Sequence, residues 1–217
     1  MEDGRTAQRE IRKVAEREWH QTRILSAALE VFAKRGYGKT SMQEVAETAG
    51  FSVGHIYSVI GKKESLFDEV LFRGGTDLEN ALRHRVEQLS DKPAIERLDA
   101  LFDEILVFFD ESPQLFQLFL SGAGEGSVEI GTQFSDRVRG VRRCIHEHVQ
   151  SLLEEAQADH DVAPLDPVDM TVACLQIVNS FLSQWALAGY SPRARGKTET
   201  MRRIIWHGLS LQSEQPD

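Results

Sequence analysis

Hydroxyl, aromatic and cationic side chains are concentrated in residues 40–66, in a pattern typical of contacts to a nucleic acid. Ser41 stands where a helix N-cap is expected, and Glu44, three residues later, completes a capping box. Gly50 ends this short helix, and Ser52 caps a second helix of about two turns. A helix this short does not fold alone, so its role is to present side chains to a partner. The segment therefore predicts a helix-turn-helix unit followed by cations.

The same region contains a longer set of residues at fixed spacing: Phe32-Ala33, Gly36-Tyr37, Thr40-Ser41-Met42, Val45-Ala46, Ala49-Gly50, Ser52, Gly54, Ile56-Tyr57, Lys63-Glu64 and Leu66. This set resembles the DNA-binding signature of the TetR (tetracycline-repressor-like) regulators, and the resemblance covers residues 22 to about 70. Two positions depart from it: Ile60 stands where the family usually has an aromatic residue, and Lys62 where it usually has Ser or Asn. Neither departure removes a backbone contact, and Lys62 adds a charge.

Phosphate contacts are expected at both ends of the unit. A helix N-terminus offers hydroxyls and free backbone N–H groups to an anion, which favours Thr40 and Ser41. Tyr57 is an aromatic residue at an exposed position, and the matching tyrosine of the family contacts phosphate. Lys63 opposes the dipole of the helix that it begins, a local misfit that a phosphate ligand would explain, and Lys62 lies beside it.

Base contacts are expected from the second helix. Val53 suits a thymine methyl group, and His55 can donate to a purine acceptor, although off DNA it would be exposed and idle. Gly54 allows the backbone to approach the DNA closely. Ser52 and Ser58 complete the set of residues that we expect to face the groove.

Charge is distributed unevenly along the 217 residues, whose net charge is −9. Residues 1–64 carry 11 Lys and Arg against 9 Asp and Glu, whereas residues 65–217 carry 14 against 25. An acidic body is repelled by DNA, so the charge pattern orients the molecule with its N-terminal part toward the duplex.

Helical periodicity runs through nearly the whole chain, which predicts an all-α fold of about nine helices. We expect a DNA-binding domain over residues 1–66, with three helices, and a ligand-binding and dimerisation domain over residues 67–217. The expected helices cover 19–35, 42–49, 53–59, 62 to about 86, 93–109, 113–120, 130–158, 167–187 and 198–211.

Two segments leave alternatives open. The N-terminal segment either extends the first helix or lies in a minor groove as an arm, and a solvated helical face is an equal alternative. Its charged residues are Arg5, Arg9, Glu10, Arg12, Lys13, Glu16, Arg17 and Glu18. Gly74 and Gly75 interrupt the fourth helix, either as a hinge between the domains or as a site of close packing.

The segment 167–187 is apolar over more than one helical face, and one subunit core can cover only part of that surface. Helix 198–211 offers a narrower apolar stripe that includes Ile205. Both features, and the family resemblance, imply a homodimer in which these two helices of each subunit form a four-helix bundle.

Aromatic residues of the body suit either a hydrophobic core or a ligand cavity, and core is the commoner role for any single member. The resemblance implies a cavity for a small-molecule effector, which such residues would line. The candidates are Phe102, Phe109, Phe116, Phe119, Phe181 and Trp185.

Little in the sequence supports a metal site, a cofactor site, a secretion signal or a membrane-spanning helix. Cys144 and His148 are one helical turn apart, but no third metal ligand follows at a useful spacing, and no cofactor motif is present. The charged N-terminus does not resemble a secretion signal. The uncharged stretch 170–192 carries a polar stripe that a membrane-spanning helix would avoid.

The sequence therefore predicts a cytoplasmic, homodimeric transcription regulator, most simply a repressor. It would bind a palindromic double-stranded DNA operator and leave it when a small apolar or amphipathic molecule enters the body. One alternative is a constitutive DNA-binding protein of the same fold, with a protein partner or no ligand. A helical enzyme with a similar head is a third, which the missing phosphate loop, metal set and catalytic triad disfavour.

Overall fold

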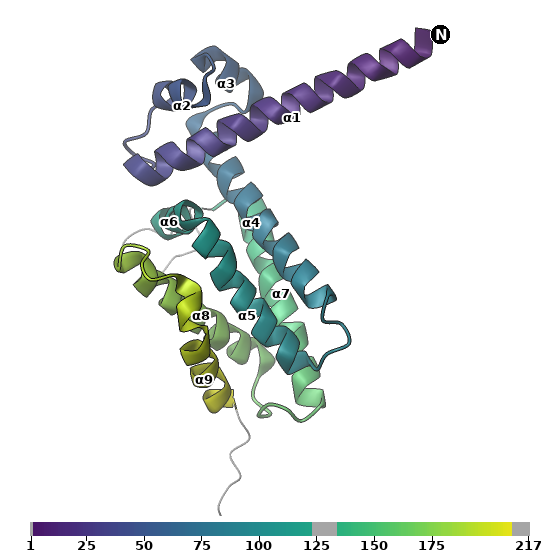
Figure 1. Cartoon of the computed structure of the whole chain (residues 1–217), viewed down its shortest axis with the longest axis vertical. Helices are drawn as coiled ribbons and strands as arrows, with labels where there is room; N and C mark the ends of the chain where they lie inside the picture. Colours follow the sequence, from purple (N-terminus) through teal and green to yellow (C-terminus); the bar gives the residue numbers. More distant parts are fainter. Residues whose placement is uncertain (1, 123–133, 210–217) are drawn as a thin grey trace, which may run out of the picture. The chain divides into compact units, whose positions relative to one another are not determined.

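The computed structural model describes residues 2–122 and 134–209, and within them it is built from α-helices and one 3₁₀ helix, with no strand. The all-α prediction is confirmed. The chain forms two compact units (Figure 1). Among the described residues, unit 1 comprises 2–73, 117–122 and 134–135, and unit 2 comprises 74–116 and 136–209. The domain division expected near residue 66 stays a prediction, since the boundary between the units lies inside a helix.

Unit 1 is built on α1 (Glu2–Arg35), which packs against α2 (Met42–Ala49) and α3 (Val53–Val59). Figure 1 shows α2 and α3 beside the C-terminal half of α1. Apolar residues at three- and four-residue steps close this core, because they lie on the facing sides of the helices. Its fully buried members include Ile24, Ala28, Phe32, Val45, Ile56 and Leu66. The last of these belongs to the first turns of α4 (Lys63–Glu87).

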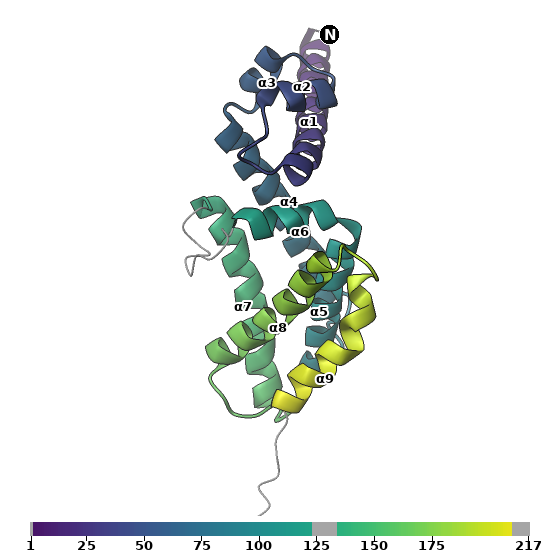
Figure 2. The same cartoon turned by 90° about the vertical axis from the view of Figure 1, so that its left-hand side faces the viewer.

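Unit 2 contains the rest of α4, α5 (Ala94–Glu111), α7 (Asp136–Ala158), α8 (Pro167–Leu187), the 3₁₀ helix η1 (Ala194–Lys197) and α9 (Thr198–Leu209). The helix α6 (Pro113–Gly122) begins in it. Among these, α5 packs on α7, α8, η1 and α9, and Figure 2 shows α8 crossing α5 and α7. Leu98, Leu101, Phe102, Leu106 and Leu153 form its fully buried centre.

The main differences from the predicted ranges concern α1, η1, α7 and α9. α1 begins at Glu2 instead of residue 19, so the N-terminal segment is helical here and not an extended arm. η1 was not predicted, because a four-residue 3₁₀ turn has no apolar period to reveal it. α7 begins at Asp136, and the expected start at residue 130 lies outside the described residues, as does the expected end of α9 at 211.

Close packing explains one of the two glycines in α4. A Cβ atom on Gly74 would lie 2.5 and 2.6 Å from the two Cδ atoms of Leu115, which is 4% exposed. That distance is well inside van der Waals contact, so Gly74 admits the Leu115 side chain. The structure therefore favours close packing over a hinge at Gly74.

Candidate nucleic-acid interface

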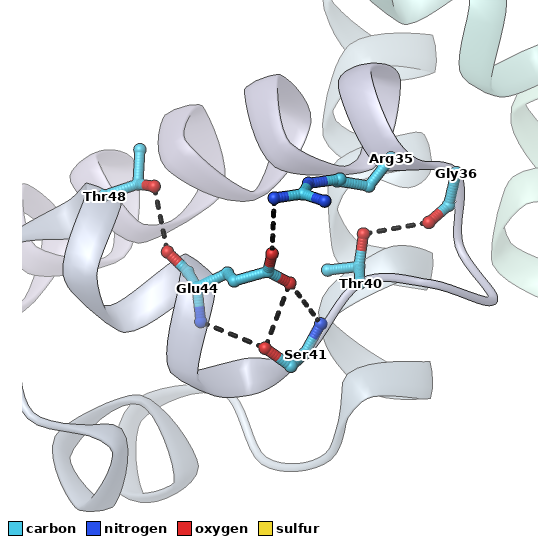
Figure 3. A network of polar contacts seen from close by, with 6 residues as sticks. All are labelled: Arg35, Gly36, Thr40, Ser41, Glu44 and Thr48. Atoms are coloured by element: carbon cyan, nitrogen blue, oxygen red, sulfur yellow. Dashed lines mark hydrogen bonds and ion pairs between the residues drawn. The ribbon is translucent and has the colours of Figure 1, made fainter.

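A network of polar contacts sets the start of α2 (Figure 3). The Ser41 hydroxyl accepts from the Glu44 N–H at 3.2 Å, and the Glu44 carboxylate accepts from the Ser41 N–H at 3.0 Å. The predicted capping box is thus present. Arg35, from the end of α1, pairs with the same carboxylate at 3.2 Å. The hydrogen bonds from Ser41, followed by the Arg35 charge, lower the pKa of Glu44.

The turn after α2 follows directly from Gly50. This residue has φ 74°, in the left-handed region, and its N–H donates to the carbonyls of Ala46 and Glu47. The next N–H, of Phe51, donates to the Ala46 carbonyl at 3.0 Å. These bonds close the helix and reverse the chain within two residues, so that Ser52 can cap α3 by accepting from the His55 N–H at 3.2 Å.

α3 has one fully buried side chain, Ile56, and its Val53, His55 and Val59 side chains are partly buried. Tyr57 is 50% exposed, although it is aromatic. Gly54 and Ser58 are exposed as well, and a Cβ on Gly54 would meet nothing within 4 Å. This outward set agrees with a helix that is presented to a groove.

The sequence led us to expect that the His55 ring is exposed and makes no contact off DNA, whereas the structure places it against other rings. Its ring packs edge-to-face on His20 of α1, with 4.8 Å between the centroids, and lies 5.0 Å from the Phe51 ring. Its Nε2 atom is buried without a hydrogen-bond partner. The side chain therefore joins α3 to α1 in this conformation, and its base contact stays a prediction.

Arg23 completes the same cluster from α1. Its guanidinium donates to the Ala49 carbonyl at 3.2 Å and lies over the Trp19 and Phe51 rings, 5.1 and 5.9 Å from their centroids. This role was not predicted from the sequence. A basic residue one turn before an apolar helix face could have indicated it, because a long cationic side chain can reach the carbonyl end of a neighbouring helix.

Lys63 is engaged within unit 1. Its ammonium group donates to the carbonyls of Tyr37 and Thr40 at 3.1 and 3.0 Å, and it lies 4.7 Å from the centroid of the Tyr37 ring. These contacts tie the start of α4 to the segment before α2. They also explain the lysine at a helix N-terminus without a phosphate, so its phosphate contact stays a prediction.

The other candidate DNA contacts divide by exposure. Thr40 is 4% exposed and its hydroxyl donates to the Gly36 carbonyl at 2.9 Å, so a phosphate contact by this hydroxyl would require that bond to be exchanged. Ser41, Ser52 and Lys62 are exposed, and Val53 is half-buried.

The candidate ligand residues do not form one group. Phe102, Phe109, Phe116 and Trp185 are buried in unit 2, and ring contacts at 5.1 and 6.4 Å connect the last three. Phe119 pairs instead with Phe134 in unit 1. Phe181 is half-buried. These roles stay predictions.

A groove of about 420 Å³ lies between α8 and α9, and none of the six aromatic candidates lines it. Met170, Cys174 and Ile205 form its buried floor, while Leu165 and Ile204 are 51% and 50% exposed. Ile205, at 2% exposed, therefore belongs to the subunit core, and the expectation that it lies at a dimer surface is wrong for this subunit. Ile204, one residue earlier, faces outward.

Metal and membrane sites are the remaining classes. No group of three or more His, Cys, Asp and Glu side chains that could hold a metal ion occurs in the described part of the chain. Within 2–122 and 134–209, no helix has the length and apolar character needed to cross a membrane.

Three carboxylates of α5 were also missed, because their partners lie far away in sequence. Asp99 accepts from Arg202 and, at 2.6 Å, from the indole N–H of Trp206. Asp110 accepts from the backbone N–H groups of Ala194 and Arg195 at 2.6 and 3.1 Å. Asp103 lies between them, and burial raises its pKa.

Comparison with known proteins agrees with this geometry. Residues 24–70 match the family model of bacterial regulatory proteins of the tetR family. The HTH-type transcriptional regulator YhgD of Bacillus subtilis is 26% identical over 164 residues, which cover 75% of this chain and 82% of that protein. The HTH-type transcriptional repressor KstR2 of Rhodococcus jostii is 30% identical over 134 residues, covering 56% and 62%.

The fold recurs in a solved structure, that of the transcriptional regulator FadR from Bacillus subtilis in complex with stearoyl-CoA. Its TM-score is 0.76 at 14% identity, over 86% of this chain and 98% of that one. Identity this low shows the shared architecture, a helix-turn-helix head followed by a helical body.

Proposed function

We propose that this chain, which belongs to the TetR family and is a transcriptional regulator, is a homodimeric repressor. A small apolar or amphipathic molecule would release it from its operator. The observation that carries the proposal is the construction of unit 1, where α1 and the capped helix α2 hold a short, capped α3 that exposes Gly54, Tyr57 and Ser58. KstR2 is named as a repressor, which supports that sign of regulation. A repressor of this kind acts on the chromosome, in the cytoplasm, and is not an enzyme.

DNA recognition is proposed to use α3 in a major groove, with Tyr57 as the phosphate contact that flanks it. Tyr57 has half of its surface exposed and no role in the core, so its hydroxyl is available. Tyr57→Phe should weaken every DNA site by a similar factor, since a phosphate contact carries no base information. A changed base preference would reassign Tyr57 to base reading.

Dimerisation is proposed to bury the rim of the groove between α8 and α9. Leu165 and Ile204 line this groove, and together with Val168 and Val172 of α8 they are between 46% and 54% exposed. An apolar surface of this kind marks a protein partner, and two copies bring two α3 helices into successive major grooves, about 34 to 36 Å apart.

Sedimentation analysis of two neighbouring residues tests this surface. Ile204→Glu should yield folded monomers, because it places a charge in the interface, whereas Ile205→Glu should unfold unit 2, because that residue is buried. Ile204→Ala is the uncharged control and should remain largely dimeric. A folded, fully dimeric Ile204→Glu protein would exclude this face.

The effector is proposed to be a long-chain acyl compound or a molecule of similar amphipathic character. The support is the fold shared with a regulator that holds stearoyl-CoA, together with the apolar side chains of unit 2. The alternative of a constitutive DNA-binding protein is supported by Phe102 and Phe116, since both rings are buried among the protein's own side chains.

One experiment separates the two. DNA selected by the protein from a random pool is titrated with and without stearoyl-CoA, with free coenzyme A as the control. Release by stearoyl-CoA and not by coenzyme A supports the effector. DNA affinity that no acyl compound changes supports the constitutive alternative, and selection of no DNA sequence would contradict the regulator itself.

A further inference from the structure

α1 continues well beyond the part of unit 1 that it holds together. Figure 1 shows it running past α2 and α3 toward the N-terminus. Contacts with the other helices begin at Trp19 and His20, and every side chain from Gln8 to Trp19 is exposed. We call residues 2–18 the α1 extension. At 1.5 Å per residue it is about 25 Å long.

One face of α1 changes from apolar, within unit 1, to basic in the α1 extension. Within unit 1 that face is apolar, and its fully buried residues include Ile24 and Ala28. His20 lies on it one turn earlier and packs on Phe51 and on His55 of α3. Further toward the N-terminus, helical steps of three and four residues lead to the three residues that we call the basic face: Arg17, Lys13 and Arg9.

Acidic residues are unevenly placed around the extension. At about 100° per residue, Glu18 lies on the side away from the basic face, while Glu16 lies at its edge. Glu10 approaches Lys13 at 3.9 Å, but both side chains are more than 70% exposed, and such a pair contributes little. The face that meets α3 in the folded unit therefore continues as a cationic surface with no neighbour among the helices described.

We propose that the α1 extension binds the phosphate backbone that flanks the bases read by α3, through Arg9, Lys13 and Arg17. A polyanion complements this face, and the face lies on the side of α1 where α3 is held, as the packing of His20 on His55 shows. The inference rests on DNA binding by unit 1. From Arg9 to Arg17 the basic face is about 12 Å long at 1.5 Å per residue, so it extends the contact by roughly three to four base pairs beyond each end of the bases that α3 reads, at 3.4 Å per phosphate along one strand.

The first test uses two matched charge changes. Glu16→Gln and Glu18→Gln alter the net charge equally, but only Glu16 lies at the basic face. Glu16→Gln should tighten binding to the selected DNA several-fold, and Glu18→Gln should leave it nearly unchanged. Equal effects of both variants would overturn the proposal, because they would report net charge alone.

The second test removes the face and the flanking DNA in turn. The variant Arg9→Gln, Lys13→Gln and Arg17→Gln keeps good helix formers, and circular dichroism checks that α1 remains helical. On DNA with about eight extra base pairs on each side, the slope of log K against log salt should fall by about 0.9 for each phosphate that the variant no longer neutralises. On DNA trimmed to the selected bases, wild type and variant should bind alike.

An equal loss on both lengths of DNA would place the three residues at the bases or in the fold, and would overturn the flanking contact. An unchanged slope on both lengths would overturn any phosphate contact by the extension. Failure of the wild type to select DNA would remove the function on which the inference rests, and is distinguished from the first two outcomes because they require the wild type to bind.

Discussion

Polar contacts in the two units span different distances along the chain. In unit 1, Ser41 and Ser52 bond groups three residues away, and the contacts of Arg23 with Ala49 and of Lys63 with Tyr37 each span 26 residues. In unit 2, the carboxylates of α5 reach partners 84 to 107 residues away. Short contacts form with their own helix, whereas the long ones exist only once unit 2 has folded. Removing them should therefore have different consequences.

The largest effect is expected from Asp99→Ala. Arg202 and Trp206 would lose their common acceptor, and loss of hydrogen bonds to a charged group destabilises by about 1.5 to 3 kcal/mol. Urea denaturation measures this change in the free energy of unfolding. Asp91→Ala is the matched control, since Asp91 pairs with Lys92 at the surface and should change stability by less than about 0.5 kcal/mol. Equal effects would show that the long-range contacts of Asp99 contribute no more to stability than a surface ion pair.

A smaller effect is expected from Ser41→Ala, which removes one side of the capping box. N-cap substitutions of this kind destabilise by about 1 kcal/mol. DNA affinity should fall with stability, because α2 supports α3. Thr48→Ala is the control, as its hydroxyl bonds the Glu44 carbonyl within the same helix and leaves the cap intact. A Ser41 variant as stable as the control would show that Glu44 alone holds the cap.

Gly74→Ala should destabilise unit 2 by up to about 2 kcal/mol, because the overpacking against Leu115 exceeds the gain of about 1 kcal/mol in helix propensity. Thermal melting of a double-mutant cycle measures the coupling. In a Leu115→Ala background, the same change should be neutral or stabilising, since the space is then open. Destabilisation in both backgrounds would mean that Leu115 is not the cause.

The smallest effects are pH-dependent and opposite in sign. The lowered pKa of Glu44 means a contribution present above the ordinary pKa of Glu and lost as pH falls through its folded pKa. Burial raises the pKa of Asp103, against the influence of Thr198 and Arg202, so its favourable contribution is present below the ordinary Asp pKa and lost as pH rises through the folded value.

Melting temperatures should therefore respond oppositely at neutral pH. Glu44→Gln should melt lower than the wild type and Asp103→Asn higher. The Glu44 difference should shrink only as pH falls below the ordinary Glu pKa toward the lower folded value, and the Asp103 difference as pH falls through its raised folded pKa toward the ordinary Asp value. An Asp103→Asn protein that melts lower at neutral pH would show that its contacts outweigh its burial.

Local features could be predicted from the sequence because their cause is local. The capping box at Ser41, the left-handed Gly50 and the bounds of α2 and α3 all depend on residues at most five apart. The all-α class follows equally from the apolar period. The candidate contacts Tyr57 and Gly54 were recognisable because an aromatic residue and a glycine on a short helix stand out from its apolar pattern.

The direction in which a side chain points could not be predicted from the sequence, because it depends on which neighbouring helix packs against it. His55 has the same place in α3 whether it faces solvent or His20, and only the packing of α1 decides. Ile204 and Ile205 are identical in type and adjacent, yet the direction in which α9 meets α8 exposes one and buries the other. The partners of Asp99 and Asp110 lie beyond any local pattern.

The carboxylates of α5 also constrain where along the chain relatives of this protein can gain or lose residues. Asp110 and Asp99 are eleven residues apart, about 16 Å along one helix, and each bonds the returning chain, at Ala194 and at Arg202. An insertion between 194 and 202 would move one of these attachments out of reach. Length variation should therefore accumulate in segment 188–193, just before the first attachment, and be rare within the eight residues after it.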